Sequence, residues 1–191
     1  MLTTAASTVG PLLGSTLLVT VAEMGDKTQL LAFVLAARLK RAGPIIAGIF
    51  VATLLNHALA GWVGAWLARW LAPEVLRWVI AVSFFAFALW ALKPDTLDAP
   101  RALSGSSVFW TTTVAFFLVE MGDKTQLATV ALAARYDALL AVVAGTTLGM
   151  MIANVPAVWA GEALAARINF TLMRWIAAGL FAVAGVLALL L

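Results

Sequence analysis

The chain has 191 residues, of which 64% are hydrophobic and 11% are charged, and its mean hydropathy is +1.04. Soluble domains contain about 45–50% apolar and about 25% charged residues, so this composition excludes an ordinary water-soluble domain. The net charge is +3 and there is no cysteine, which excludes disulfides, thiolate metal ligands and cysteine nucleophiles.

Six apolar stretches follow one another along the chain, and the breaks between them contain charged residues, Gly or Pro. The stretches are residues 11–37, 44–68, 76–92, 108–134, 138–160 and 172–191. A transmembrane helix needs about 20 largely apolar residues. The pattern therefore predicts an all-α integral membrane protein with six transmembrane helices and no separate soluble domain.

The longest break, residues 93–107, divides the chain into two similar halves. Residues 23–30 read Glu-Met-Gly-Asp-Lys-Thr-Gln-Leu, and residues 120–127 repeat this segment identically at an offset of 97. The offset persists as Gly48 matches Gly145 and as Arg77-Trp78 matches Arg174-Trp175. We therefore predict a first three-helix repeat at 1–92, a linker at 93–107 and a second three-helix repeat at 108–191. Because each repeat has an odd number of spans, the two repeats should be inverted in the membrane.

Basic residues near the predicted helix ends indicate the orientation. They are scattered singly, so we expect no nucleic-acid partner. One side carries Arg38, Lys40, Arg41, Lys93, Arg101, Arg167 and Arg174, and the other side carries Arg69, Arg77 and Arg135. This difference favours a multi-pass protein of the inner (plasma) membrane with both termini outside the cytoplasm.

Residues 23–29 (the first motif) and residues 120–126 (the second motif) place ionisable groups inside apolar spans. A charge at the centre of a spanning helix costs roughly 2.5–3.5 kcal/mol, so six such groups cost about 15–20 kcal/mol before pairing. Pairing of Glu with Lys four residues later on the same helix is one explanation. It leaves Asp26 and Asp123 without partners and does not explain the duplication.

Convergence of both motifs near the membrane midplane explains the duplication better. The acidic ligands would be Glu23, Asp26, Glu120 and Asp123, with neutral oxygens from Thr28, Gln29, Thr125 and Gln126. Such oxygen ligands suit hard cations such as Ca²⁺, Mg²⁺ or Mn²⁺. Two lysines against four carboxylates leave a charge of −2 if Lys27 and Lys124 point inward. Gly25 and Gly122 could mark an unwound turn.

Other polar or soft side chains near the motifs are supporting candidates. Met24 and Met121 flank the acids, where their thioethers would favour Mn²⁺ over Ca²⁺, although packing is the commoner role. Asn56 and Asn154 could bond to a neighbouring helix or line an ion path. We interpret His57, the only histidine, as a packing or hydrogen-bonding residue.

The doubled Glu-x-Gly-Asp-Lys-Thr motif in a six-helix chain of this length resembles the Gdt family of Ca²⁺/Mn²⁺:proton exchangers, especially its small bacterial manganese-efflux branch of MneA type. The resemblance covers nearly the whole chain. It implies export of Mn²⁺ or Ca²⁺ in exchange for protons, with Glu23, Asp26, Glu120 and Asp123 at the transport site. It does not decide between the two ions.

The sequence thus predicts a secondary transporter rather than an enzyme, with divalent cation, protons and the lipid bilayer as its partners. No cofactor is expected other than the transported Mn²⁺ or Ca²⁺. A divalent-cation channel and an exporter of a small organic cation stay open as alternatives. Whether copies of the chain associate as a homo-oligomer is also open.

Overall fold

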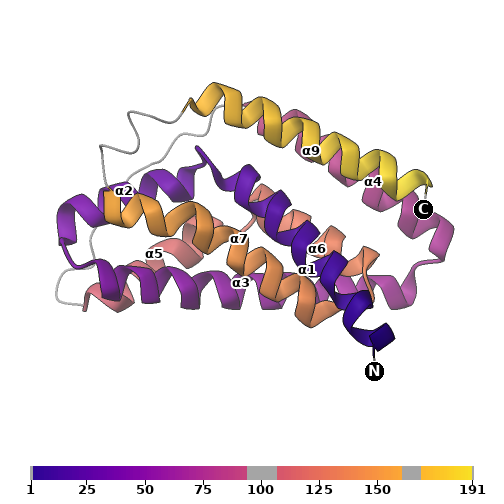
Figure 1. The fold of residues 1–191 in the computed structure, drawn as a ribbon, viewed down its shortest axis with the longest axis horizontal. Coiled ribbons are helices and arrows are strands. Elements are labelled where there is room, and N and C mark those ends of the chain that lie inside the picture. Colours follow the sequence, from indigo (N-terminus) through magenta and orange to yellow (C-terminus); the bar gives the residue numbers. More distant parts are fainter. Residues whose placement is uncertain (1, 94–106, 161–168, 191) are drawn as a thin grey trace.

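The fold is helical throughout the part of the chain that the computed structural model describes, residues 2–93, 107–160 and 169–190 (Figure 1). Its helices are α1 (Leu2–Glu23), α2 (Lys27–Leu39), α3 (Ala42–Trp70), α4 (Pro73–Ala91), α5 (Val108–Glu120), α6 (Lys124–Arg135), α7 (Leu139–Ala160) and α9 (Phe170–Leu190). Most of the predicted linker lies outside the described residues. Arg101 and Arg167, which entered the orientation count, lie outside them too.

The first and fourth predicted spans are each divided into two helices. Residues 11–37 are divided between α1 and α2, whose axes differ by 68°. Residues 108–134 are divided in the same way between α5 and α6. Both breaks contain a glycine in the left-handed region, Gly25 at φ 86° and Gly122 at φ 79°. A right-handed helix cannot continue through this conformation, so the expected unwound turns are confirmed.

Four described helices, α3, α4, α7 and α9, are long and apolar enough to cross a membrane. The bent pair of α1 and α2 makes a fifth candidate span when it is counted as one crossing. α5 is apolar but has only 13 residues. Length and composition of the described helices therefore support a multi-pass membrane protein with four or five candidate spans.

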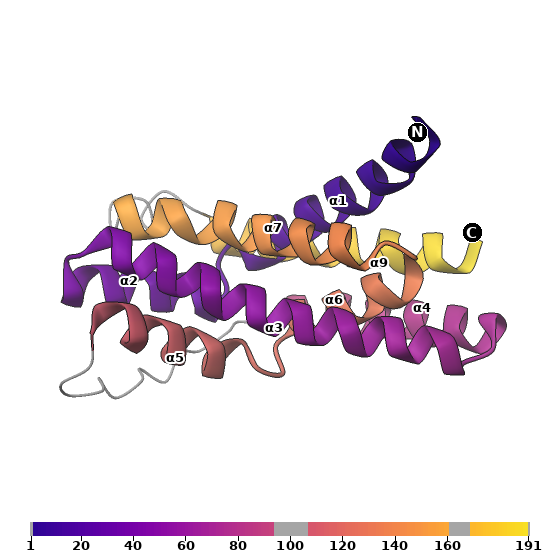
Figure 2. The same ribbon diagram turned by 90° about the horizontal axis from the view of Figure 1, so that it is seen from below.

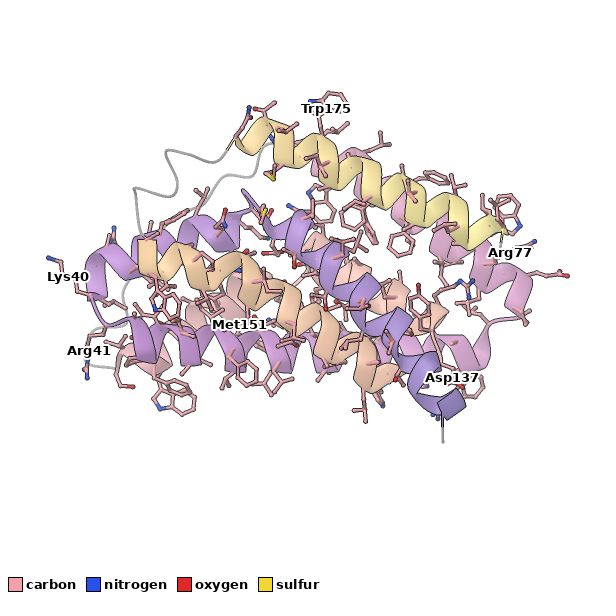
Figure 3. All side chains as sticks on the ribbon, viewed as in Figure 1. Lys40, Arg41, Arg77, Asp137, Met151 and Trp175 are labelled. Carbon is pink, nitrogen blue, oxygen red and sulfur yellow. The ribbon has the colours of Figure 1, made fainter. Side chains whose placement is uncertain are left out.

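The helices lie roughly along the long axis of the molecule (Figures 1 and 2). α1 begins at the end where the C-terminus lies, whereas α5 begins at the opposite end (Figure 1). Lys40 and Arg41 lie at one end of the molecule, and Arg77 and Asp137 lie toward the other (Figure 3). The two motif-bearing segments therefore run through the molecule in opposite directions.

Helices of the two halves are interleaved. α3 contacts α5, α6 and α7, while α1 contacts α7. Glycines allow close contacts between these helices, because a Cβ atom on Gly145 would lie 2.5 Å from the Leu12 carbonyl oxygen and one on Gly149 would lie 2.7 Å from that of Thr16. These two glycines therefore serve close packing between the halves, and both motifs are held within one helical body.

The distribution of polarity is the reverse of that in a water-soluble protein. Large apolar side chains cover the outside, including Trp62, Trp66 and Trp70, which are 60%, 48% and 74% exposed. Most polar and charged side chains of the two motifs, including all four acids, are buried. Lipid tails can cover an apolar surface without cost, but they cannot hydrogen-bond to charged groups, so such groups collect inside.

Candidate cation site

The same sequence builds the same turn twice. α1 ends at Glu23 and α2 begins at Lys27, and the intervening Asp26 has φ −82° and ψ 168°. In the second motif Asp123 has φ −77° and ψ 163°. The amide of Gly25 donates to Gln29 Oε1 at 2.9 Å, and the amide of Gly122 donates to Gln126 Oε1 at 2.6 Å. A glutamine four residues later thus satisfies a backbone donor that the broken helix exposes.

The aspartates stand at the N-cap positions of α2 and α6 but do not act as ordinary caps. An N-cap aspartate commonly accepts a hydrogen bond from a backbone amide of its own helix. Neither Asp26 nor Asp123 makes such a bond. Their carboxylates instead engage the lysine of the opposite motif: Lys27 Nζ lies 2.7 Å from Asp123 Oδ1, and Lys124 pairs with Asp26.

In these crossed ion pairs, each lysine points toward the aspartate of the other motif. The alternative of a Glu–Lys pair within each motif does not describe the structure, because each lysine pairs with an aspartate from the other motif. Lys124 is buried, whereas the side chain of Lys27 is 23% exposed. Two ion pairs between the halves thus bring the two broken helices together and neutralise two of the four carboxylates.

Carboxylates from both motifs converge in the interior. One oxygen each from Glu23, Glu120 and Asp123 lies within 4.8 Å of the others. All four motif acids, including Asp26, are at most 1% exposed. Like charges this close repel strongly in a medium of low dielectric constant, so the arrangement calls for a positive charge or protons. A divalent cation fits this requirement, because oxygen ligands at about 2.0–2.6 Å are typical of such ions.

The threonines bond to the glutamates of their own motifs. Thr28 Oγ1 donates to Glu23 Oε2, and Thr125 Oγ1 donates to Glu120 Oε1 at 2.8 Å. Each glutamate keeps a second buried oxygen, Glu23 Oε1 and Glu120 Oε2, that accepts no hydrogen bond from a described residue. A buried carboxylate oxygen usually has a partner, so these two atoms are the natural contacts for a cation.

The amide side chains connect the turns to neighbouring helices. Gln29 Nε2 donates to the Ala153 carbonyl oxygen at 2.9 Å, and Gln126 Nε2 donates to Asn56 Oδ1 at 3.2 Å. Asn56 in turn donates to the carbonyl oxygen of Phe117 at 3.1 Å, near the end of α5. Asn154 donates to the Met150 carbonyl oxygen at 3.0 Å within its own helix. Gln29, Gln126 and Asn56 therefore hold the broken helices in place.

The two methionines occupy different surroundings. Met121 is 53% exposed, so its thioether does not lie among the buried acids. Met24 lines a small cavity together with Asp26, Lys124 and Arg174 of α9. Only the first motif therefore has its methionine beside an acidic side chain of the site.

The structure also brings His57 to the site, which the sequence interpretation did not assign to it. His57 is fully buried on α3, and its Nε2 lies 3.6 Å from Glu120 Oε1. A signal for this position exists in the sequence, because the offset of 97 aligns His57 with Asn154, a polar residue in an equivalent apolar helix.

Sequence comparisons relate the chain to known transporters. The family model of GDT1, described as a divalent cation/proton antiporter, matches residues 11–99 and 108–191. A protein of Vibrio cholerae serotype O1 named "Putative manganese exporter" is 51% identical over 164 residues, covering 85% of this chain and 82% of that protein. The "GDT1-like protein sll0615" of Synechocystis sp. is 31% identical over 178 residues, covering 80% of this chain and 84% of that protein. No solved structure matches the chain.

Proposed function

The chain belongs to the GDT1 family of divalent cation/proton antiporters, and we propose that it exports Mn²⁺ across the inner membrane in exchange for protons. Family membership makes it a transporter and not an enzyme, as the sequence predicted. The Vibrio cholerae relative is named for manganese, which supports Mn²⁺ as the exported ion. Ca²⁺ is the second candidate ion.

The observation that carries this proposal is the buried group of three carboxylates contributed by both motifs. Glu23 comes from the first motif, and Glu120 and Asp123 come from the second. A site shared by two broken helices can change its exposure when the helices shift against each other, as in other transporters built from discontinuous helices. Three buried acids with only a structural role would destabilise the folded protein by several kcal/mol without any compensating interaction.

The other motif residues take supporting roles in this proposal. Glu23, Glu120 and Asp123 bind the cation, with Asp26 as a fourth acid close by. Thr28 and Thr125 orient the two glutamates, while Gln29 and Gln126 hold the turns. Lys27 and Lys124 balance the aspartates, so four carboxylates and two lysines leave a charge of −2, which one divalent ion neutralises.

We also propose that the halves, residues 1–92 and 108–191, are two inverted three-helix repeats that cross the membrane six times in all. The opposite directions of α1 and α5 support the inversion (Figure 1). The termini would lie outside the cytoplasm. In this cysteine-free chain, a cysteine replacing Ala42 should react only from the cytoplasmic side and one replacing Ala72 only from outside. The reverse labelling pattern would contradict the orientation but not the inversion.

Exchange for protons follows from energetics. Moving a divalent ion out of a cell whose interior is negative by about 100 mV costs about 4.6 kcal/mol. Protons entering on the same carboxylates can offset this cost, because a proton neutralises a carboxylate that has lost its cation. Entry of two protons for each exported ion would make the cycle electroneutral, and we favour this ratio because both motifs contribute acids.

Flux measurements on the purified chain in proteoliposomes test the proposal. An imposed proton gradient should drive Mn²⁺ in the opposite direction, and adding Mn²⁺ to the detergent-solubilised protein should release protons. Asp137→Asn provides a matched control, since this carboxylate is exposed toward one end of the molecule, away from the buried motifs (Figure 3). The control should retain both signals.

Two outcomes would contradict the proposal. Mn²⁺ flux that ignores the proton gradient, together with binding that releases no protons, would favour a channel. Transport of an organic cation such as lysine with no response to Mn²⁺ or Ca²⁺ would favour the organic-cation exporter.

A further inference from the structure

His57 has an environment that packing alone does not explain. The side chain is 0% exposed, and neither Nδ1 nor Nε2 makes a hydrogen bond with a described residue. A buried imidazole ordinarily satisfies at least one ring nitrogen, because leaving both without partners costs free energy. Hydrogen bonding to another described residue is therefore not the role of His57.

Nε2 of His57 lies near a carboxylate oxygen of Glu120. The Nε2 to Oε1 distance is 3.6 Å, which is too long for a hydrogen bond. Two ligand atoms that hold one ion at about 2.1–2.5 Å, at a right angle, lie about 3.0–3.5 Å apart. Oε1 has a second lone pair beside the one that accepts from Thr125, and Oε2 of the same carboxylate has no hydrogen-bond partner among the described residues. A cation bound by Glu120 can therefore reach Nε2 with little rearrangement. Glu120 belongs to the group of three acids already described.

The two halves of the site differ chemically at this position. Gln29 donates to the carbonyl oxygen of Ala153, and Gln126 donates to the side chain of Asn56, so residues 153 and 56 are equivalent in space as well as at the offset of 97. The next residues, Asn154 and His57, are then equivalent too. One half thus offers an imidazole nitrogen where the other offers an amide, and the Oδ1 of this amide also has no hydrogen-bond partner among the described residues.

Ligand chemistry connects this asymmetry to ion choice. Ca²⁺ and Mg²⁺ take oxygen ligands almost exclusively. An imidazole nitrogen binds first-row transition metals better than it binds these hard ions. We propose that His57 is a nitrogen ligand of the transported cation and the residue that makes the site prefer Mn²⁺ to Ca²⁺. This inference rests on the proposed function, because it names the specificity determinant of the same site.

Pulsed electron paramagnetic resonance of bound Mn²⁺ tests the ligand directly. His57 is the only histidine of the chain, so protein purified with a histidine-free tag has one source of imidazole nitrogen. Mn²⁺ bound to the unlabelled protein should show electron spin echo modulation from a coordinated ¹⁴N. Labelling histidine alone with ¹⁵N should change this modulation, and His57→Asn should abolish it.

Ion competition tests the effect on selectivity. His57→Asn should lower the affinity for Mn²⁺ relative to Ca²⁺ by about tenfold or more, since loss of a group at a metal site commonly costs this much. Thr53→Val is the matched control, because Thr53 is buried one turn earlier on α3 and its hydroxyl also has no hydrogen-bond partner among the described residues. The control should keep the selectivity ratio of the unmodified protein.

The results separate failure of this inference from failure of the proposed function. Stoichiometric Mn²⁺ binding with a spectrum that ignores the histidine label would overturn the role of His57 and leave the exchanger intact. An unchanged Mn²⁺ to Ca²⁺ selectivity in His57→Asn would likewise overturn the role of His57 and leave the exchanger intact. If the unmodified protein binds neither Mn²⁺ nor Ca²⁺, both the function and the inference are wrong. The labelling experiment needs no substitution, so it decides the matter even if His57→Asn does not fold.

Discussion

The first and second motifs have identical sequences and closely similar turns, yet their surroundings differ. In the first motif, Met24 and Asp26 line a small cavity that Arg174 of α9 helps to enclose. In the second motif, Met121 and Gly122 are exposed. α9 contacts α1, whereas α4 contacts α6, so the last helix of each half does not occupy an equivalent place. A duplicated sequence therefore produces a duplicated turn but not a symmetric site.

The site thus has parts that the repeat makes alike and parts in which the two halves differ. The parts that must be alike, the acids and the turns that hold them, follow from the repeated residues. The parts that differ, such as His57 opposite Asn154 and the two lysines, come from neighbouring helices or from their packing. A set of substitutions made in pairs, one in each motif, can separate the symmetric from the asymmetric contributions.

The largest expected effect is symmetric. Glu23→Gln and Glu120→Gln should each reduce Mn²⁺ transport by about 100-fold or more, because each removes a charge from a shared group of acids and both changes keep the shape of the side chain. Proteoliposome flux measures this loss, and monodisperse elution in detergent checks the fold. A motif whose acids can all be replaced while flux persists would show that the site is not shared.

Substitutions of the two lysines should differ in their effect on stability. Lys124 is buried and Lys27 is 23% exposed, so Lys124→Met should destabilise the protein by about 3–5 kcal/mol and Lys27→Met by clearly less. Thermal unfolding in detergent measures both. Combining Lys124→Met with Asp26→Asn should recover part of the loss, because the pair is then neutral on both sides. Equal losses of stability in the two lysine variants would contradict the conclusion that the two crossed ion pairs differ in burial.

Gly122→Ala should have a smaller effect that is purely conformational. The residue has φ 79°, and a Cβ atom there would meet nothing within 4 Å. The left-handed conformation costs an alanine about 1–2 kcal/mol, with no added clash. Gly122→Asn should cost less, since asparagine tolerates this conformation better. Thermal unfolding in detergent measures both variants. A lower stability of Gly122→Asn than of Gly122→Ala would contradict the left-handed conformation of this turn.

The smallest expected effect concerns the methionines. Met24→Ala should lower the preference for Mn²⁺ over Ca²⁺ modestly, since Met24 lies beside Asp26, and Met121→Ala should leave it unchanged, since Met121 is mostly exposed. Competition uptake of the two ions measures both ratios. A change in Met121→Ala equal to that in Met24→Ala would show that the two methionines act symmetrically. An unchanged ratio in both variants would make them packing residues.

The sequence by itself determined the membrane character, the duplication and the local turns. Hydropathy depends only on composition along the chain, and the Gly at the centre of each motif decides the backbone conformation through its own steric freedom. Burial of the motif acids could be anticipated as well, since ionisable groups in apolar spans must face the protein interior. These properties are local, or follow from the solvent, and need no knowledge of partners.

Only the tertiary structure decided which side chains meet. Lys27 and Asp123 are far apart in the sequence, and nothing in the motif distinguishes pairing across the halves from pairing within one helix turn. The repeat aligns His57 with Asn154, but its place 3.6 Å from Glu120 depends on how α3 packs against α5 and α6. Contacts of this kind depend on the relative rotation and depth of packed helices. Those are set by the sum of many small packing terms rather than by any single residue.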